Sequence, residues 1–476
     1  MMSFVRQQIE DEQGIALMVV IGVIALISVM AVGGFALASQ SVHSTARLQT
    51  EEKSFQAASS GLDRVLATFS QANFQGQNSY QVSGTTPDGS YLVSVGRDPA
   101  VPYRFSIVCT GTAGTETARV RQDFYFLDLW SVNIGQGENP GSPPGTAGDF
   151  NGGPEIHGPF FVSGGNFNSN PDFFGGPLFA SKDVSFGGGT GWYPEPAGTK
   201  YVIYAGGACS GQDASKVIVQ HSCPDIELPW VAADYMASML AKATSQSADN
   251  LRGDGNPAVA NGEVATTGAV NTYTGTRYPG QLASQPYKVI NGPLSITGSS
   301  ASFGKVSGAT NWDDFAFDTV NNTLYVEGIV YVKGDVTIGS GVANYKGSGI
   351  IVSEGDVNID TGGTFQPVGG GSGANDLSAE NSLAVIGTNV TLGRDSNFEG
   401  TVFCNQTFEI GKSSIFQGAV HANLITNPSP PKAELWMEEG MAAYKVPEGM
   451  PGTATDPRGS NFGGGVVIPG TWSRIQ

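Results

Sequence analysis

Apolar residues form one long uninterrupted run near the N-terminus. Residues 13–46 contain no Asp, Glu, Lys or Arg, and Ile15–Leu37 has the sequence IALMVVIGVIALISVMAVGGFAL. A helix formed by Ile15–Leu37 extends about 35 Å at about 1.5 Å per residue. The hydrocarbon core of a membrane is about 30 Å thick. The pattern therefore predicts a helix that spans a membrane with some tilt.

An amphipathic segment without Pro follows the apolar run over residues 39–72. Its larger apolar side chains recur every three or four residues, which is the spacing of one helix face. We therefore expect a single helix over residues 15–72, preceded by a polar leader over residues 1–14. The apolar positions of the second half are Leu48, Phe55, Ala58, Leu62, Val65, Leu66 and Phe69.

Strand-like sequences come next. YLVSV, YRFSIVCTG and ARVRQDFYFLDLW are rich in β-branched and aromatic residues and are separated by the turn sequences RDPAVP and TAGTE. We expect a small β-meander over residues 73–130 that packs on the amphipathic half of the helix. Residues 131–157 are rich in Gly and Pro and are expected to form a linker.

A short unit recurs in the rest of the chain: a small residue, three mostly apolar residues, a polar break, then apolar–x–apolar and a turn. Copies at Gly158 and Gly176 begin 18 residues apart, and copies at Gly328 and Gly349 begin 21 residues apart. Short strands at such a period predict a β-solenoid of stacked coils, with a β-sandwich as the alternative. Further copies begin at Ser382, Gly400 and Gly418, with a looser copy at Gly292.

The expected fold class is therefore mainly β: a long N-terminal transmembrane helix, a small β-meander and a parallel β-helix (β-solenoid) with short capping helices. The solenoid is expected over residues 158–430, with an insertion at about residues 190–290 that contains a helix from about Trp230 to Ser245. Residues 431–476 are expected to cap it with a short helix over 432–445 and a final strand that buries Trp472.

The composition agrees with many short strands and tight turns. Only 14% of the 476 residues are charged, and the chain contains 67 Gly and 26 Pro. The low charge does not fit the usual signature of disorder. The net charge is −18 at pH 7, so binding to a phosphate backbone is unfavourable and we expect no nucleic-acid partner.

The chain has four cysteines, whose pairing depends on whether the protein is exported. Cys209 and Cys223 lie in one Gly- and Ser-rich segment, and in an exported chain they are the natural disulfide pair. The alternative is two unrelated thiols. Cys109 and Cys404 lie in strand-like runs and are expected to be buried small apolar residues.

The N-terminal order of elements resembles a known family. A short leader ending in Gly14, a charge-free half-helix, an amphipathic half-helix and a β-meander are similar to type IV pilin-like proteins, most closely the PilX-like minor pilins and pseudopilins. The stretch EKSFQAASSGLDRVLATF is similar to the Ala-rich segment that follows the membrane helix in that family. The resemblance covers about the first 130 residues, and the later repeats are similar to the β-helical C-terminal domains of some PilX-like proteins.

This resemblance implies that a prepilin peptidase cuts after Gly14 and leaves Ile15 as the new N-terminus. An uncleaved signal anchor is the alternative. Major pilins carry a Glu at the fifth mature position, which here is Val19. By resemblance to tip pseudopilins and to several PilX-like proteins that also lack the acid, Val19 implies a minor or tip role.

Acidic residues raise the question of chemistry. Asp335, Asp356 and Asn389 share one position of the aligned repeats with Asp183, so we expect them to stack along one corner. Such a column either binds Ca²⁺ or caps the turns, and Asp and Asn at corners favour capping. No nucleophile, P-loop or HExxH motif occurs in a suitable setting, so we expect no catalytic residue, cofactor or metal. Other acids considered are Asp313, Asp314, Asp360, Asp395 and Glu399.

The leading hypothesis is a non-enzymatic structural protein of a type IV pilus or related secretion filament. It would be held in the inner membrane through Ile15–Leu37, with its body exported, and would contact other pilin-like subunits through the N-terminal helix. A prepilin peptidase is a further expected partner. Aromatic loops at 167–179 and 190–196 either bind a glycan or surface ligand or belong to the core. The alternatives are a membrane-anchored carbohydrate-active enzyme and a stand-alone adhesin.

Overall fold

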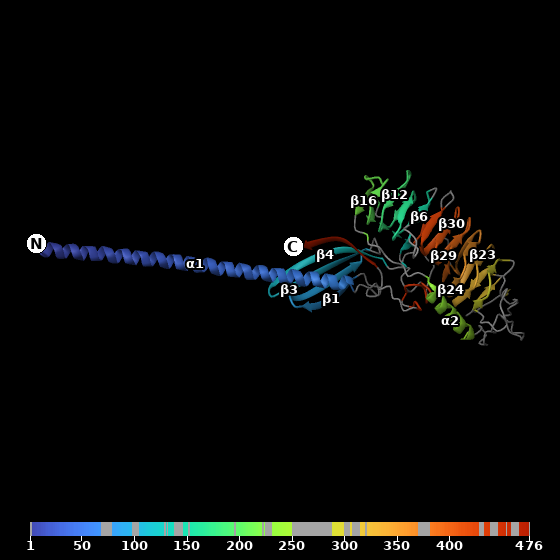
Figure 1. Cartoon of the computed structure of the whole chain (residues 1–476), viewed down its shortest axis with the longest axis horizontal. Helices are drawn as coiled ribbons and strands as arrows, with labels where there is room; N and C mark the ends of the chain where they lie inside the picture. The colour runs from blue at the N-terminus through green and yellow to red at the C-terminus, as the bar shows by residue number, and fades with distance from the viewer. Residues whose placement is uncertain are drawn as a thin grey trace.

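The protein is described from a computed structural model. It describes residues 2–67, 79–97, 104–127, 130, 132–137, 146–150, 153–194, 197–220, 223, 231–249, 288–298, 305–306, 315–318, 321–369, 381–427, 433–437, 446–453, 455–457 and 466–475. The chain is mainly β with one long N-terminal helix. That helix projects from a small β-sheet, and a larger β-body lies beyond the sheet (Figure 1).

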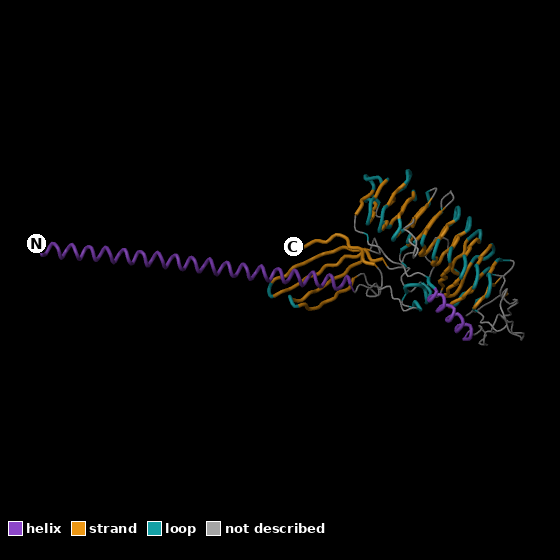
Figure 2. Tube along the Cα trace, in the orientation of Figure 1, coloured by secondary structure: helices purple, strands orange, loops and turns teal. Residues whose placement is uncertain are grey.

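The N-terminal helix, α1 (Met2–Ala67), is continuous through the expected leader and the apolar run. It therefore begins before Ile15, the expected start, and residues 68–72 lie outside the described residues. Met18–Ala67 contains a stretch long and apolar enough to cross a membrane, and none of that stretch is buried within the protein. The two halves of α1 thus have different surroundings: the first stands free and the second packs on strands (Figure 2).

The small sheet, called the head, is an antiparallel meander packed on the end of α1. Its strands are β1 (Ser79–Thr86), β2 (Gly89–Arg97), β3 (Arg104–Ala113) and β4 (Glu116–Leu127). A fifth strand, β34 (Val466–Ile475), pairs antiparallel with β4. Alternate residues of β2 and β3 face the helix, so Val93, Val95, Ile107 and Cys109 form a buried core with Leu62 and Val65 of α1.

The body, β5 to β33, begins with short strands in the first part of the chain. These are β5 (Asn133–Gly135), β6 (Thr146–Phe150), β7 (Glu155–His157), β8 (Phe160–Val162), β9 (Asn166–Ser169), β10 (Asp172–Gly175), β11 (Leu178–Ala180), β12 (Val184–Phe186), β13 (Trp192–Pro194), β14 (Tyr201–Ala205), β15 (Cys209–Ser210) and β16 (Val217–Gln220).

A second series follows helix α2 (Ala233–Asp249). It comprises β17 (Val289–Ile290), β18 (Leu294–Ile296), β19 (Lys305–Val306), β20 (Ala316–Asp318), β21 (Thr323–Tyr325), β22 (Gly328–Val332), β23 (Val336–Gly339), β24 (Asn344–Ser353), β25 (Val357–Asp360), β26 (Thr364–Pro367), β27 (Asn381–Gly387), β28 (Val390–Leu392), β29 (Asn397–Cys404), β30 (Thr407–Ile410), β31 (Ile415–Ala422), β32 (Leu424–Asn427) and β33 (Glu434–Trp436).

Body strands pair in parallel with their equivalents in neighbouring repeats, as the repeat pattern predicted. Val336 pairs with Val357, and Val357 pairs with Val390, so equivalent residues of the repeats are in register. The looser copy at Gly292 joins the same ladder, because Leu294 pairs with Val336. Among the described pairings of the body, only β20 with β21 is antiparallel. This pattern differs from a sandwich of hairpins, which requires antiparallel neighbours.

The order of stacking differs from the order of the chain. The body begins at β5, which pairs on one side with β8 and on the other with β31, from near the end of the chain. Strands β6 and β7 likewise pair with β32 and β33. The first series therefore starts in the middle of the stack and runs to one end at β16. The second series starts at the other end, at β17 and β18, and returns to the middle at β33.

Helix α2 follows the first series and precedes the second along the chain, and it packs on β22. Tyr235, Met239 and Ala243 form its buried face, which confirms the helix expected from Trp230 to Ser245 with a shift of a few residues. The hydroxyl of Tyr235 donates a hydrogen bond of 2.8 Å to the carbonyl of Gly449. A segment near the C-terminus thus covers the same flank of the body.

Three expectations about domain limits differ from the structure. The expected insertion at about residues 190–290 begins with β13 to β16, which continue the parallel pairing of the body. Residues 131–157, expected to be a linker, contain β5, β6 and β7. Within the expected cap, residues 434–436 form strand β33 instead of a helix, because Glu434–Trp436 pairs with β7. The final strand is present, but it completes the head through β4. The side chain of Trp472 is not among those that the structure describes, so its burial stays a prediction.

Candidate functional site

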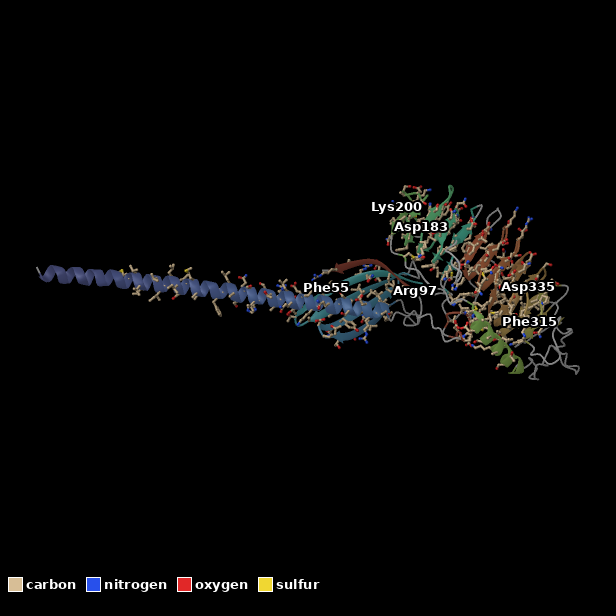
Figure 3. All side chains as sticks on the ribbon, viewed as in Figure 1. Phe55, Arg97, Asp183, Lys200, Phe315 and Asp335 are labelled. Carbon is tan, nitrogen blue, oxygen red and sulfur yellow. The ribbon has the colours of Figure 1, made fainter. Side chains whose placement is uncertain are left out.

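The most unusual surface of the molecule is the first half of α1. We call residues 18–48 the stem. Its larger apolar side chains are between 48% exposed, at Val23, and 80% exposed, at Phe35. Exposed apolar surface of this extent on a helix requires lipid or other apolar helices around it. Side chains of the stem project from both edges of the helix (Figure 3).

The predicted processing positions lie on this helix. Gly14 and Ile15 fall within the continuous α1, and cleavage between them stays a prediction. Val19 is 59% exposed and belongs to the apolar surface of the stem. With no carboxylate at this position, the stem offers only apolar contacts there.

The second half of α1 is held closely against the head. A Cβ atom on Gly111 would collide with the backbone oxygen of Ser54 and the backbone nitrogen of Ala58. A Cβ on Gly61 would lie 2.6 Å from Cγ of Tyr91. Only residues without a side chain permit this approach, so the two glycines fix the distance between the helix and the sheet. The stem therefore continues from an anchored helix and is not joined to the head by a loop.

The corner acids have structural partners. Oδ1 of Asp335 accepts the backbone N–H of Asp356 at 2.9 Å. Oδ1 of Asp356 accepts both the backbone N–H of Asn389 at 3.1 Å and its side-chain amide at 2.9 Å. Each residue therefore caps the corner of the next repeat, as the capping interpretation predicted. Asp183 does the same for Ala208 in the first series, at 2.7 Å.

The other acids considered from the sequence do not extend this corner ladder. Asp395 forms an ion pair of 2.9 Å with Arg394, and Glu399 is buried in β29. Asp360 is exposed at the end of β25, and Asp313 and Asp314 lie outside the described residues. The described acids named from the sequence thus have no arrangement that we assign to catalysis.

The aromatic loops belong mostly to the core. Phe167, Phe173 and Trp192 are buried and pack in one cluster. Phe174 and Tyr193 are the outward members of the same strands, and their rings stack with centroids 4.4 Å apart. The interpretation as core therefore holds for the buried rings, and a ligand for this region stays a prediction.

All four cysteines are thiols in this structure. Cys109 and Cys404 are buried, as predicted, and burial raises the pKa of the Cys109 thiol to about 11. Cys209 pairs with Val184 at the last strand of its sheet, and burial raises its pKa as well. The Cys209–Cys223 disulfide is not formed here and stays a prediction.

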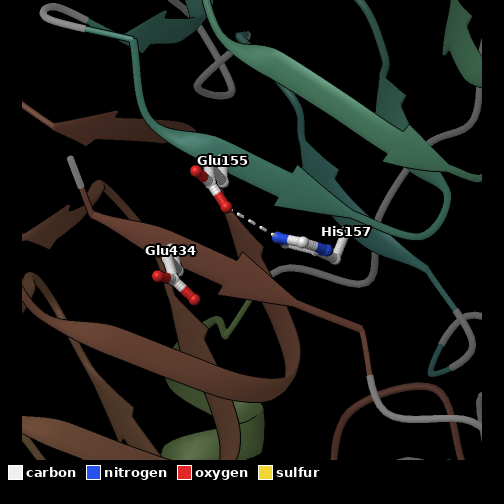
Figure 4. A group of neighbouring side chains, drawn as sticks. All are labelled: Glu155, His157 and Glu434. Atoms are coloured by element: carbon white, nitrogen blue, oxygen red, sulfur yellow. Dashed lines mark hydrogen bonds and ion pairs between the residues drawn. The ribbon is translucent and has the colours of Figure 1, made fainter. Parts of the chain in front are cut away.

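One group of side chains was not predicted from the sequence. Glu155 and His157 of β7 meet Glu434 of β33, and one potential ligand atom from each lies within 4.8 Å of the others (Figure 4). No local motif reveals this group, because Glu434 reaches the other two only through the pairing of β33 with β7. Its chemistry is taken up below as a separate inference.

The comparisons with known proteins are sparse. No protein-family model matches the chain. No curated protein matches it either. Among solved structures, the chain is similar to the crystal structure of the competence-associated pilin ComZ from Thermus thermophilus, at 16% identity and a TM-score of 0.42, over 89% of this chain and 97% of that chain. A TM-score this low does not establish a common fold, so a function has to be proposed from the chain's own geometry.

Proposed function

We propose that this chain is a pilin-like structural subunit of a type IV pilus or related secretion filament. The stem lies in the membrane before assembly and packs beside the apolar helices of other subunits afterwards. The observation that carries this role is the division of α1: its first half exposes apolar side chains, and its second half is packed rigidly in the head. A helix that served only as a membrane anchor would not need this continuity.

The body is proposed to be a β-solenoid carried at the cell surface. Support comes from the two sheets of the body, of 19 and 10 strands, in which equivalent strands of successive repeats pair in parallel. Its proposed role is structural, since the corner acids hold backbone N–H groups of neighbouring repeats. The fit to a PilX-like or tip subunit rests on Val19, which leaves the stem without the acid of major pilins.

Processing in the native host tests the pilin-specific proposal. Intact-mass measurement and N-terminal sequencing of the purified protein are expected to find Ile15 at the N-terminus. A protein that retains Met1 would leave only an anchored body. Replacing Gly14 by a bulky residue, Gly14→Phe, is expected to abolish cleavage, and Gly22→Phe within the stem serves as its matched control because a Cβ there meets no atom within 4 Å.

Assembly is tested by crosslinking in cells of the native host. Single cysteines introduced at exposed stem positions such as Leu26 and Val29 are expected to crosslink to other filament subunits. A cysteine at buried Val65 is the control and is expected to give no such product. Crosslinks that appear equally at all three positions, or at none, would argue against packing through the stem.

A further inference from the structure

The group at the middle of the body combines one imidazole with two carboxylates. Glu155 and His157 are two residues apart on β7 and therefore face the same side of the strand. Glu434 lies directly opposite Glu155 in the parallel ladder, and Trp436 lies opposite His157. The side chains of Glu155 and His157 are 23% and 15% exposed, so water and ions reach the group while most of its surface is covered.

Aromatic neighbours hold the imidazole in one orientation. The ring of His157 stacks on Trp436 with centroids 3.5 Å apart and on Phe174 with centroids 4.4 Å apart. The ring planes are within 8° of parallel, so the nitrogens lie at the open edge of the stack. Nε2 of His157 is 3.3 Å from Oε2 of Glu155. The ring is thus positioned before any ligand arrives, which lowers the entropic cost of binding.

Negative charge accumulates beside this ring. Asp172 follows Glu155 in the same ladder, so three carboxylates occupy consecutive positions with Glu434. Like charges directly opposite one another on neighbouring strands are unfavourable. Asp172 accepts the backbone N–H of Gly191 at 2.9 Å, whereas Glu155 and Glu434 both face the imidazole group. A bound cation would offset the repulsion between these two.

We propose that Glu155, His157 and Glu434 bind one divalent transition-metal cation of the zinc class. Imidazole nitrogen and carboxylate oxygen are ligands that zinc accepts at about 2.0–2.2 Å, with water in a fourth position. Ligand atoms within 4.8 Å of one another need only small side-chain rotations to reach one ion. The indole N–H of Trp436 donates to Oε2 of Glu434 at 2.7 Å and so orients that carboxylate, as outer partners of metal ligands commonly do.

The position gives the metal a structural consequence. β7 belongs to the first series of the body and β33 to the second, and their ladder covers only Glu434–Trp436 against Glu155–His157. A cation bound by residues of both strands would crosslink the two series in the middle of the stack. This inference does not depend on the filament role, because the bound cation would stabilise the body whatever the stem contacts.

Metal titration of the full-length chain tests the site. Tag-free protein in detergent micelles is treated with a chelator, transferred to metal-free buffer and titrated with Zn²⁺ in a calorimeter. We expect one ion per chain and a rise in the unfolding temperature of the body. Substituting Co²⁺ is expected to give the visible absorption of a four-coordinate site. Among the described residues, this is the one group of three His, Cys, Asp or Glu side chains found close enough for a metal.

Three ligand variants and two comparisons make the result specific. His157→Phe keeps an aromatic ring in the stack, and Glu155→Gln and Glu434→Gln keep side-chain size; each is expected to abolish the one-to-one binding. His43→Gln, on the exposed stem, is the matched control and is expected to bind as the unchanged chain does. Trp436→Phe keeps the ring but loses the indole N–H, so zinc affinity is expected to fall by about 10- to 100-fold.

Circular dichroism of each variant establishes that it is folded, and the two Gln variants keep the test decisive if His157→Phe unfolds. The proposal would be overturned if the unchanged chain does not bind Zn²⁺, or if His157→Phe and Glu434→Gln bind it as tightly as the unchanged chain does. Neither outcome bears on cleavage at Gly14 or on crosslinking of the stem, so failure of the metal site and failure of the filament role remain distinguishable.

Discussion

The guanidinium carbon of Arg474 lies 5.3 Å from the centroid of the Phe55 ring. Arg474 is near the end of β34, and Phe55 is in the half of α1 that packs on the head. The last strand and the packed half of the N-terminal helix therefore meet in the head. Because β34 pairs with β4, the whole body is an insertion between two neighbouring strands of one small sheet.

This contact predicts a measurable contribution of the last strand to head stability. Cation–π contacts at exposed sites contribute about 0.5–1 kcal/mol. Arg474→Met keeps most of the side chain but removes the charge, so we expect the free energy of unfolding of the head to fall by about that amount. Denaturant unfolding followed by a probe in the head measures it. Arg394→Met, on the body, is the control and should leave the head transition unchanged.

Because α1 lies so close to the sheet, we expect the addition of one methyl group between them to lower the stability of the head. Gly111→Ala places a Cβ against the backbone of Ser54 and Ala58, which cannot move without shifting the helix. Overpacking of this kind costs about 1–3 kcal/mol. Gly96→Ala in β2 is the matched control, because a Cβ there meets no atom within 4 Å. Equal stabilities of the two variants in thermal unfolding would contradict the close approach.

The corner ladder predicts a local effect in the body. Asp356→Ala leaves two donors of Asn389 without their acceptor, so we expect a loss of about 1–2 kcal/mol. Hydrogen exchange is expected to be faster at the backbone N–H of Asn389 than in the unchanged chain. Asp360→Ala, an exposed acid of the same strand region, is the control. Unchanged exchange at Asn389 would mean that the capping bond contributes nothing to the stability of the corner.

The repeat sequence was sufficient to predict the register within one series. Aligned repeats place Asp335, Asp356 and Asn389 at one position, and the structure joins these residues by hydrogen bonds. A strand period of two and a fixed turn position determine which residues lie opposite one another. The buried face of α2 and the burial of Cys109 and Cys404 were predictable for the same reason, since local spacing and apolar character decide them.

Long-range pairing was not predictable from the repeats. Nothing in the sequence near His421 indicates that it lies beside Ile134, from the start of the body. The helix expected over 432–445 was wrong at Glu434–Trp436 for the same reason. Pairing with β7 holds these residues as a strand, although the apolar residues of the segment have helical spacing. The metal group was missed for this reason, as Glu155 and Glu434 become neighbours only when the two series join.

The last prediction concerns alkaline pH and the buried thiol of the head. Cys109 is fully buried between α1 and the sheet, and burial raises its pKa from 9.0 to about 11. The folded head therefore keeps a proton that the unfolded chain releases above about pH 9. Stability from this group is complete below pH 9 and is expected to decline as the pH rises from about 9 to about 11.

Cys109→Ala removes the titrating thiol and isolates its effect. The variant is expected to be less stable at neutral pH because it leaves a small cavity, but the difference from the unchanged chain should shrink steadily above pH 9. Denaturant unfolding of both chains at about pH 7, 9 and 10.5 measures this difference with a probe in the head. A difference that stays constant across these pH values would show that the thiol does not lose stability by releasing its proton. Since every other ionisable group is common to both chains, a shrinking difference can be assigned to Cys109 alone.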